Sequence, residues 1–305
     1  MPDIATSTTA IDLSRLPPPT FIAVPSYEAI LAEVIAYVQS PEVLPSFDAT
    51  IESDPAVKIV EVLAYRELLL IKKFNDNALK IMLAYATGGD LDQIGARLNV
   101  ERLVLDPGDP DDNIDPTYET DDAFRERIQL APESFTVAGP EAAYIYHARS
   151  ADATIRDASA IEGEPGQVIV TILSSLGDGT ADADQIAAVE DVLGVVAGNR
   201  VRPLGDEVIV QSAEIVTYVI EAQLTVYSGP DQTVVLAASQ ASTEAWVNRG
   251  GKLGLDAVRA AISAAMFVEG VQNVNLIHPA ADVVADKTQA TKCVGVNITV
   301  VGLGD

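Results

Sequence analysis

Apolar residues recur every three or four positions through the N-terminal third of the chain, which is the spacing of amphipathic helices. The spacing predicts a first helix over about residues 27–39, with Ser26 as its N-cap. A second helix start follows, because Asp54 can cap a helix and Pro55 fits its first position. Neither Gly nor Pro occurs from Ala56 to Ala86. We therefore predict one long helix there, of roughly 45 Å at about 1.5 Å per residue.

This long helix carries more apolar surface than one neighbour can cover. One stripe runs along its length and supplies our interface candidates, Ile59, Leu63, Leu70, Phe74 and Ile81. Further apolar residues lie on another side, at Val62, Tyr65 and Leu69. A helix with two apolar sides needs two neighbours, and the N-terminal region is too small to supply both. We expect one of them to be another chain.

The stretch YATGGDLDQIGARLNV, residues 85–100, interrupts the helical pattern. We interpret Gly88 or Gly89 as the left-handed residue that ends the long helix, and Asp90 as the cap of a short new helix. A phosphate-binding loop would need a G-x-G-x-x-G motif or a Lys-Ser/Thr pair after a strand, and this stretch has neither. The two glycines and Asp90 are thus predicted to be structural.

Beyond residue 122 the pattern changes to short helices alternating with strands. Residues 216–226 alternate apolar and polar side chains like a half-buried strand. The last predicted strand, about 294–301, places on one face Val294, Val296, Ile298 and Val300. A helix followed by two strands occurs twice, which suggests tandem modules.

Together these patterns predict an α+β fold class, in which a helical region with a long helix precedes two small α/β modules with antiparallel or mixed sheets. The predicted division is an extended arm over 1–25, a helical wedge or bundle domain over 26–105, an acidic Pro-rich linker over 106–122, and α+β modules over 123–212 and 213–305. The arm contains the run Pro17-Pro18-Pro19, which favours extended backbone. It either packs against a neighbour or is a partly disordered terminus.

The predicted linker contains eight acids and three prolines, a composition that favours exposed chain. Its acids and amides also fall at positions 1, 3, 5, 9 and 12 of a calcium loop, and these weak metal candidates are Asp111, Asn113, Asp115, Glu119 and Asp122. The sixth position, which needs glycine for a sharp turn, is Pro116, and the twelfth is Asp instead of Glu. We therefore favour a solvated linker over a metal site.

Acidic residues outnumber basic ones by 45 to 19, which gives a formal net charge of −26. Such a charge, without a basic cluster, repels phosphate backbones, so we expect no nucleic-acid partner. No apolar stretch reaches the roughly 18–20 residues that span a bilayer, so we expect no membrane partner. Cys293 is the only cysteine, which excludes an intrachain disulfide framework and agrees with a cytoplasmic protein.

Catalytic motifs are missing from the sequence. The only histidines, His147 and His278, have no nucleophile motif beside them, and neither G-x-S-x-G nor H-E-x-x-H occurs. Cys293 with His278 as base is an alternative, but the apolar face of its strand explains a buried thiol more simply. With 45 acids some carboxylate pairs lie close by chance. We therefore predict no enzymatic activity, no catalytic residue and no cofactor.

The stretches SDPAVKIVEVLAYRELLL and NDNALKIMLAYATGGDLDQIGARLNV closely resemble the N-terminal signature of the baseplate protein J family. The resemblance continues through ESFTVAGPEAAYIYHARSADATIRDASAI, GNRVRPLGDEVIVQSAEIVTYVIEAQLTV and FVEGVQNVNLIHPAADV. It covers about residues 50–301 in the expected order. These are wedge proteins of contractile phage tails and related injection systems.

The resemblance implies a structural, non-enzymatic wedge subunit that dimerises within a wedge and has no cofactor. Its partners would be a second copy, neighbouring wedge proteins, and sheath-initiator-like and hub proteins nearby. It would occupy the host or producer cytoplasm during assembly and the baseplate afterwards. Two alternatives stay open, namely an acidic scaffold or surface-binding protein, calcium-stabilised at 111–122, and a carboxylate-dependent hydrolase.

Overall fold

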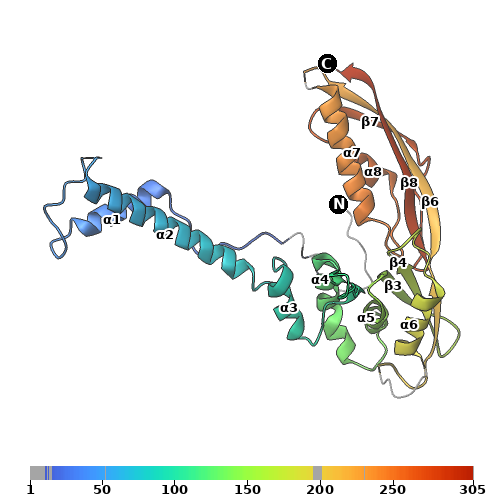
Figure 1. Ribbon diagram of the computed structural model, residues 1–305. Helices are drawn as coiled ribbons and strands as arrows, with labels where there is room; N and C mark the ends of the chain where they lie inside the picture. The colour runs from blue at the N-terminus through green and yellow to red at the C-terminus, as the bar shows by residue number, and fades with distance from the viewer. Residues whose placement is uncertain are drawn as a thin grey trace. The chain divides into compact units, whose positions relative to one another are not determined.

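The computed structural model describes residues 11, 13, 16–51, 53–194, 201–229 and 231–304 (Figure 1). The chain divides into compact units, one of them Ile11–Glu101, which we call the helical unit. The body of the other, Arg102–Asp305, we call the mixed unit. Helices occur in both, and the described sheets have two or three strands. The predicted α+β class is confirmed.

The helical unit contains α1 (Tyr27–Val38), α2 (Pro55–Leu79) and α3 (Gly88–Ala96). The Ser26 hydroxyl accepts a hydrogen bond from the Ala29 amide, which caps α1 as its sequence predicts. At α2 the Asp54 carboxylate accepts from the Ala56 amide at 2.7 Å, and Pro55 is the first helical residue. Both caps satisfy amide groups that the first helical turn leaves without a partner.

Helix α2 ends earlier than its sequence pattern predicts. It stops at Leu79 and not at Ala86, so it is about 38 Å long at about 1.5 Å per residue. The amides of Met82 and Tyr85 donate to the carbonyls three residues before them, at 3.0 Å each. These tighter turns replace the α-helical pattern although no Gly or Pro interrupts it.

The glycine pair forms the first two residues of α3 instead of ending α2. Gly88 has a φ of +50°, the left-handed conformation expected at one of the two glycines, while Gly89 does not. The N-cap of α3 is Thr87, and Asp90 lies in the first turn. The predicted capping role of Asp90 is therefore wrong, because its own amide already donates to the Thr87 carbonyl. An acid in the first turn still stabilises the helix through its dipole.

The mixed unit opens with a hairpin, formed by β1 (Val104–Asp106) and β2 (Thr117–Tyr118), and continues into α4 (Asp121–Leu130). The predicted linker is thus largely exposed, and it forms this hairpin. Gly108 has a φ of +69°, and a Cβ there would lie 2.2 Å from the Ile114 carbonyl oxygen. Only glycine fits this turn.

A buried ion pair anchors the hairpin to α4. Arg127 donates to both carboxylate oxygens of Glu119, through Nε at 3.1 Å and through Nη2. The same carboxylate accepts from the Leu103 amide at 2.9 Å, at the start of the hairpin. Arg102 and Arg127 both lie over the ring of Phe124, at 4.7 and 5.6 Å from its centroid. Glu119 and Arg127 are 5% and 3% exposed, so water screens their interaction little.

A three-stranded sheet follows, with order β3-β4-β5. Its strands are β3 (Ile155–Glu162), β4 (Gln167–Ser174) and β5 (Glu207–Ser212). The helices of this region are the 3-10 helix η2 (Ala131–Phe135), α5 (Glu141–Ala151) and α6 (Ala183–Leu193). Strand β4 pairs antiparallel with β3 and parallel with β5. The sequence predicts a helix over about 183–197 that opens with a capping box of Asp182 and Gln185, and this box is present at the start of α6. Residues 195–197 lie outside the described residues. Helices α5 and α6 close one core with this sheet.

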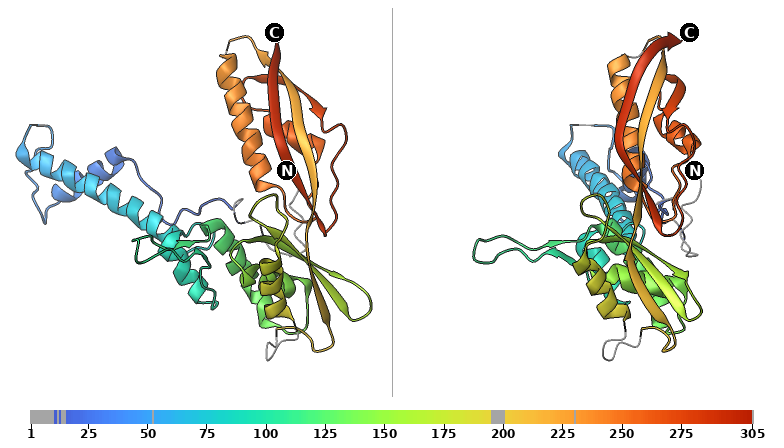
Figure 2. Two further views of the ribbon diagram at one scale, coloured as in Figure 1. Left: turned by 45° about the vertical axis from the view of Figure 1, so that its right-hand side comes forward. Right: turned by 90° about the vertical axis from the view of Figure 1, so that its right-hand side faces the viewer.

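The second three-stranded sheet has the order β7-β6-β8. Its strands are β6 (Glu214–Tyr227), β7 (Val271–His278) and β8 (Gln289–Gly304). The helices of this region are α7 (Gln232–Arg249) and α8 (Arg259–Met266). Strand β6 pairs antiparallel with β7 and parallel with β8. Helices α7 and α8 cover one face (Figure 2), so the alternate residues of β6 from Ile220 to Val226 are buried. Strand β8 begins at Gln289, five residues before the predicted start at about residue 294. Helix α8 begins at Arg259.

A single residue connects the last strand of the first sheet to the first strand of the second. Ala213 separates β5 from β6; its amide donates to the Ile172 carbonyl in the first sheet. The next amide, of Glu214, donates to the Thr288 carbonyl beside the second sheet. The sheets also differ in topology, because β3 and β4 form a hairpin while β7 and β8 lie on opposite sides of β6. The repeated helix–strand–strand order therefore does not reflect a repeated fold.

Glu119→Gln should lower the free energy of unfolding by about 3–5 kcal/mol, because it leaves Arg127 buried without a counter-charge. Urea denaturation followed by circular dichroism measures the change. Asp122→Asn is the matched control, since it makes the same chemical change in an acid that pairs with Arg125 at 2.6 Å but is 93% exposed. The control should change stability by less than about 1 kcal/mol. Equal effects of the two variants would contradict the buried pair.

Candidate assembly surfaces

Helix α1 covers only one side of α2. The buried α2 residues are Val57, Val60 and Ala64, at the three- and four-residue spacing of one helix face. Ile30 of α1 is 2% exposed, in keeping with this contact. The remaining circumference of α2 has no helix of the helical unit packed along it in the described residues. Its apolar side chains there are the candidate assembly surfaces.

The first stripe of α2 consists of Ile59, Leu63, Leu70 and Phe74, and all four are exposed. Their exposed fractions are 62, 53, 62 and 53%. Ile81, the fifth candidate, is 69% exposed but follows the end of α2 in the turn region. The stripe repeats at intervals of four and seven residues, close to the period of a straight helix. A straight stripe of this length is suited to a second helix.

The second stripe consists of Val62, Tyr65 and Leu69, which are 58, 53 and 45% exposed. It lies roughly 120° around the helix from the first stripe, at about 100° per residue. Arg66 and Lys73 fall between the stripes on this projection and are exposed. Because charged residues separate the two stripes, they are suited to two neighbours and not to one broad contact.

The chain before α1 is held at two points, one on α2 and one in the turn region after it. The Asn75 side chain accepts from the Ile22 amide at 3.0 Å and donates to the Ile22 carbonyl at 2.8 Å. The Tyr85 hydroxyl donates to the Leu16 carbonyl. The described part of the predicted arm is thus tethered through side chains whose role the apolar pattern did not reveal. Residues 1–10, 12, 14 and 15 of the arm lie outside the described residues.

The five calcium candidates do not converge. Asp111, Asn113 and Asp115 lie in the hairpin loop. Glu119 binds Arg127, and Asp122 pairs with Arg125. Among the described residues no group of three His, Cys, Asp or Glu side chains is arranged to hold a metal ion.

The candidates for nucleophilic chemistry also lie apart. His278 pairs with Glu221 and Cys293 with Tyr218, on the two sides of β6. Two strand spacings separate them, roughly 10 Å, which exceeds hydrogen-bond reach. His147 lies on α5, where burial lowers its pKa, and its Nε2 is buried without a hydrogen-bond partner. These groups form no triad.

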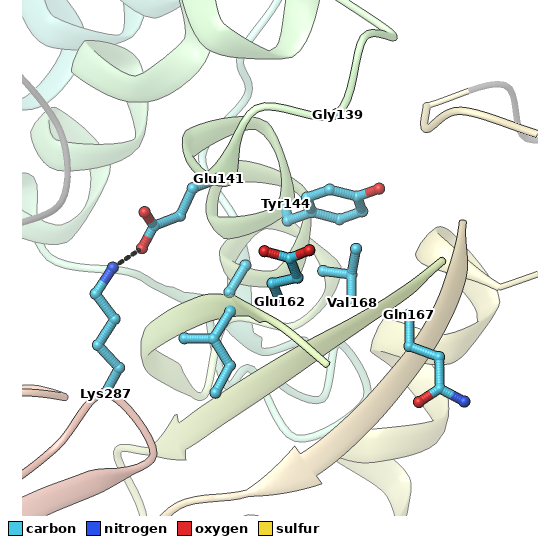
Figure 3. Close-up of a pocket in the computed structure, with 9 residues that line it drawn as sticks. Gly139, Glu141, Tyr144, Glu162, Gln167, Val168 and Lys287 are labelled. Atoms are coloured by element: carbon cyan, nitrogen blue, oxygen red, sulfur yellow. Dashed lines mark hydrogen bonds and ion pairs between the residues drawn. The ribbon is translucent and has the colours of Figure 1, made fainter. Parts of the chain in front are cut away.

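A shallow pocket of about 360 Å³ lies where α5 and β3 approach the loop before β8 (Figure 3). Three of its lining side chains are engaged in structural contacts. Lys287 pairs with Glu141 at 2.7 Å, and the Tyr144 hydroxyl donates to Asp206. Burial and this hydrogen bond raise the pKa of Tyr144. The arrangement ties parts of the mixed unit together.

Glu126 of α4 links the two sheet regions of the mixed unit. Its carboxylate accepts from Arg149 of α5 and from Lys252 after α7, at 2.8 Å each. Burial alone would raise its pKa, but the two cations outweigh this and hold the pKa below the ordinary value of 4.5. Arg156 adds a contact to the carbonyl of Asn248 at 2.9 Å. Sequence patterns gave no signal for this link, since its members are far apart in the chain.

Comparison with known proteins agrees with a structural role for these surfaces. Residues 52–109 match the baseplate J-like N-terminal domain, and residues 136–212 match the baseplate J-like central domain. The chain is also 42% identical over 291 residues to baseplate protein J of Escherichia phage P2, covering 93% of this chain and 95% of that protein. The chain belongs to the baseplate J-like family. The resemblance inferred from its sequence is confirmed.

The match to the baseplate J-like N-terminal domain contains both stripes of α2, the turn at Gly88 and α3. The match to the central domain runs from the end of η2 to the end of β5. No described helix is long and apolar enough to cross a membrane.

Glu126→Gln should lower the free energy of unfolding by about 1 kcal/mol at neutral pH, since the link is partly exposed. Because the folded pKa is below 4.5, the contribution is present above that pH and lost as the pH falls through the folded pKa. The stability difference between wild type and variant should therefore shrink in acid. Urea denaturation between neutral pH and pH 3 measures it, with Glu164→Gln in the exposed β3–β4 turn as control. A difference independent of pH would contradict the link.

Proposed function

We propose that this chain is a structural wedge subunit in the baseplate of a contractile phage tail or phage-tail-like injection particle. It dimerises and joins neighbouring wedge proteins around the central hub. It assembles in the cytoplasm of the host or producer cell and then resides in the baseplate. The observation that carries the proposal is the first stripe of α2, which is more than half exposed along a helix of 25 residues.

The exposure of the first stripe has an energetic cost that a partner would remove. Complete burial of a Leu, Ile or Phe side chain contributes about 1.5–3 kcal/mol. Covering four side chains that are a little over half exposed would contribute roughly 3–7 kcal/mol. Association itself costs about 4–15 kcal/mol. One stripe therefore offsets this cost only in part, and each neighbour must add contacts beyond the stripe.

Two stripes on separate sides of one helix support two different neighbours. We assign one to a second copy of this chain and the other to a helix of another wedge protein. Helix α2 carries four basic and three acidic residues, a net charge of +1, whereas the whole chain carries −26. Like-charge repulsion between acidic subunits is thus weakest at this helix.

The boundary between the helical and mixed units falls between Glu101 and Arg102, before the hairpin. Glu119 fixes the hairpin to the mixed unit through Arg127 and the Leu103 amide. We therefore place the pivot for rigid-body motion during baseplate opening near Glu101, and not within residues 106–122.

Leu63→Asp and Leu70→Asp should each abolish wedge assembly, because a buried aspartate without a partner costs more than the stripe contributes. Co-purification of neighbouring wedge proteins and size-exclusion chromatography with light scattering measure this. Val284→Asp, in the loop between β7 and β8, is the control because it is also apolar and 68% exposed. Full assembly of both α2 variants would overturn the proposal.

The alternative of a calcium-stabilised acidic scaffold makes a different prediction. Because the carboxylates of Glu119 and Asp122 are engaged by Arg127 and Arg125, we expect millimolar calcium to leave the melting temperature within about 1 °C. Differential scanning fluorimetry with calcium, with magnesium and with chelator tests this. A rise specific to calcium, removed by Asp111→Asn with Asp115→Asn, would favour the scaffold. The hydrolase alternative would need a carboxylate pair in one cleft whose substitution abolishes turnover.

A further inference from the structure

Strand β8 is an edge strand whose outer side is open over most of its length. It pairs with β6 on its inner side. On its outer side Ala290 forms a bridge with Leu253, and the Gln289 carbonyl accepts from the Gly254 amide at 3.0 Å. Beyond Thr291, no described strand or loop pairs with this side (Figure 2). Alternate amide and carbonyl groups of residues 293–304 therefore face outward.

The open edge has no charged side chain and no proline, and its two bulges leave a regular segment between them. Proteins protect free edges with lysine or other charged side chains, proline, short strands or β-bulges. Residues 293–304 contain no charge and no proline over twelve positions. At about 3.3 Å per residue they extend roughly 40 Å. Between two register shifts lies Gly295–Val300, which is regular and rich in β-branched residues.

The two register shifts add exposed apolar side chains to this edge. Tyr218 pairs with Cys293 but the next residue of β6 pairs with Gly295, so Val294 is an extra residue. The second shift leaves Val301 extra in the same way. Val294 and Val301 are 60 and 58% exposed. The first shift therefore corrects the prediction that Val294 lies on the face of Ile298, because a bulge turns it outward.

We propose that β8 of a second copy of this chain pairs antiparallel with this edge, so that the two sheets become one continuous sheet of six strands. This inference rests on the part of the proposed function that makes the chain self-associate, and it locates one self-contact outside α2. The exchange of main-chain hydrogen bonds between edge strands provides the affinity. The two copies are related by a two-fold axis near Asn297 or Ile298.

The edge is complementary to itself about that axis. In an antiparallel pair centred on Asn297, Val301 of one copy lies opposite Cys293 of the other, and centring on Ile298 places it opposite Gly295. Either position is beside a groove of about 410 Å³ that Cys293–Val296 form with Glu244, Val247 and Asn248 of α7. Each copy thus offers both an exposed valine and a hollow that can receive one.

Charge also favours a second copy as the occupant. Residues 213–305 contain nine acids and five basic residues, a net charge of −4, while residues 102–212 carry −15. Two copies therefore meet through the least acidic part of the mixed unit. Because the edge carries no charge, it does not attract a basic partner electrostatically. It does not repel a second uncharged strand either.

Disulfide trapping tests the geometry in the full chain and in the assembled particle. In a Cys293→Ser background, Asn297→Cys should link two copies when the axis lies at residue 297. The double variant Asn297→Cys with Thr299→Cys should link them when it lies at 298, because residue 297 then faces 299. Val284→Cys in the same background is the exposed control. Failure of both edge variants to link above the control would overturn the pairing.

Lysine substitutions on the edge strand test the affinity of the proposed β8 pairing. Val294→Lys with Val301→Lys should raise the dissociation constant of the β8 self-contact at least tenfold, measured by sedimentation velocity. It should leave the self-contact through α2 intact. The control variant Val234→Lys with Val284→Lys adds the same charge at side chains that are 64% and 68% exposed. It should leave the dissociation constant of the β8 self-contact unchanged.

The outcomes separate this inference from the proposed function. If Leu63→Asp blocks assembly while the edge variant changes nothing, the β8 pairing is wrong and the wedge function stands. If the edge variant releases a different wedge protein and leaves self-association unchanged, the occupant is that protein's strand and the inference is overturned. Loss of only the β8 self-contact supports it. Far-ultraviolet circular dichroism of each variant verifies that the fold is retained.

Discussion

Helix α2 has apolar residues on three sides and a single helix, α1, to cover them. This constraint organises the helical unit. The side at Val57, Val60 and Ala64 is satisfied within the chain, and the two stripes are left to solvent. Removing apolar area from water is the dominant favourable term in association. In the proposed wedge, other chains would remove the two stripes from water.

The mixed unit shows the opposite design, in which polar contacts join parts that are already folded. Ala213 carries the chain directly from one sheet into the other, so the sheets cannot separate far. Glu126, Arg156 and Lys287 add ties from α4, β3 and the loop before β8. Each of these contacts contributes little to the free energy of unfolding, because it is partly exposed to solvent. Their number along one junction makes the mixed unit a block that moves as a whole.

Local features of this fold were predictable from sequence. Ser26 and the capping box at Asp182 follow from residues within one helical turn, and the first stripe follows from a regular period. The end of α2 was not predictable, because nothing in the local sequence shows that Asn75 and Tyr85 hold a distant segment. In the sequence Glu119 is one of eight acids of the predicted linker, and no local pattern indicates its buried contact with Arg127, eight residues away. The bulge at Val294 needs the register of β6, which no single strand contains.

The distribution of charge is compatible with the proposed self-association in spite of a net charge of −26. Residues 102–212 hold 22 of the 45 acids, while α2 is near neutral and residues 293–304 are uncharged. Acidic surface far from the contacts keeps free subunits apart through long-range repulsion, and salt screens that repulsion beyond roughly 8 Å at physiological ionic strength. Short-range apolar and main-chain contacts are screened far less. Association through such contacts therefore begins only where the stripes or the edge strands already face one another, which favours ordered assembly over random aggregation.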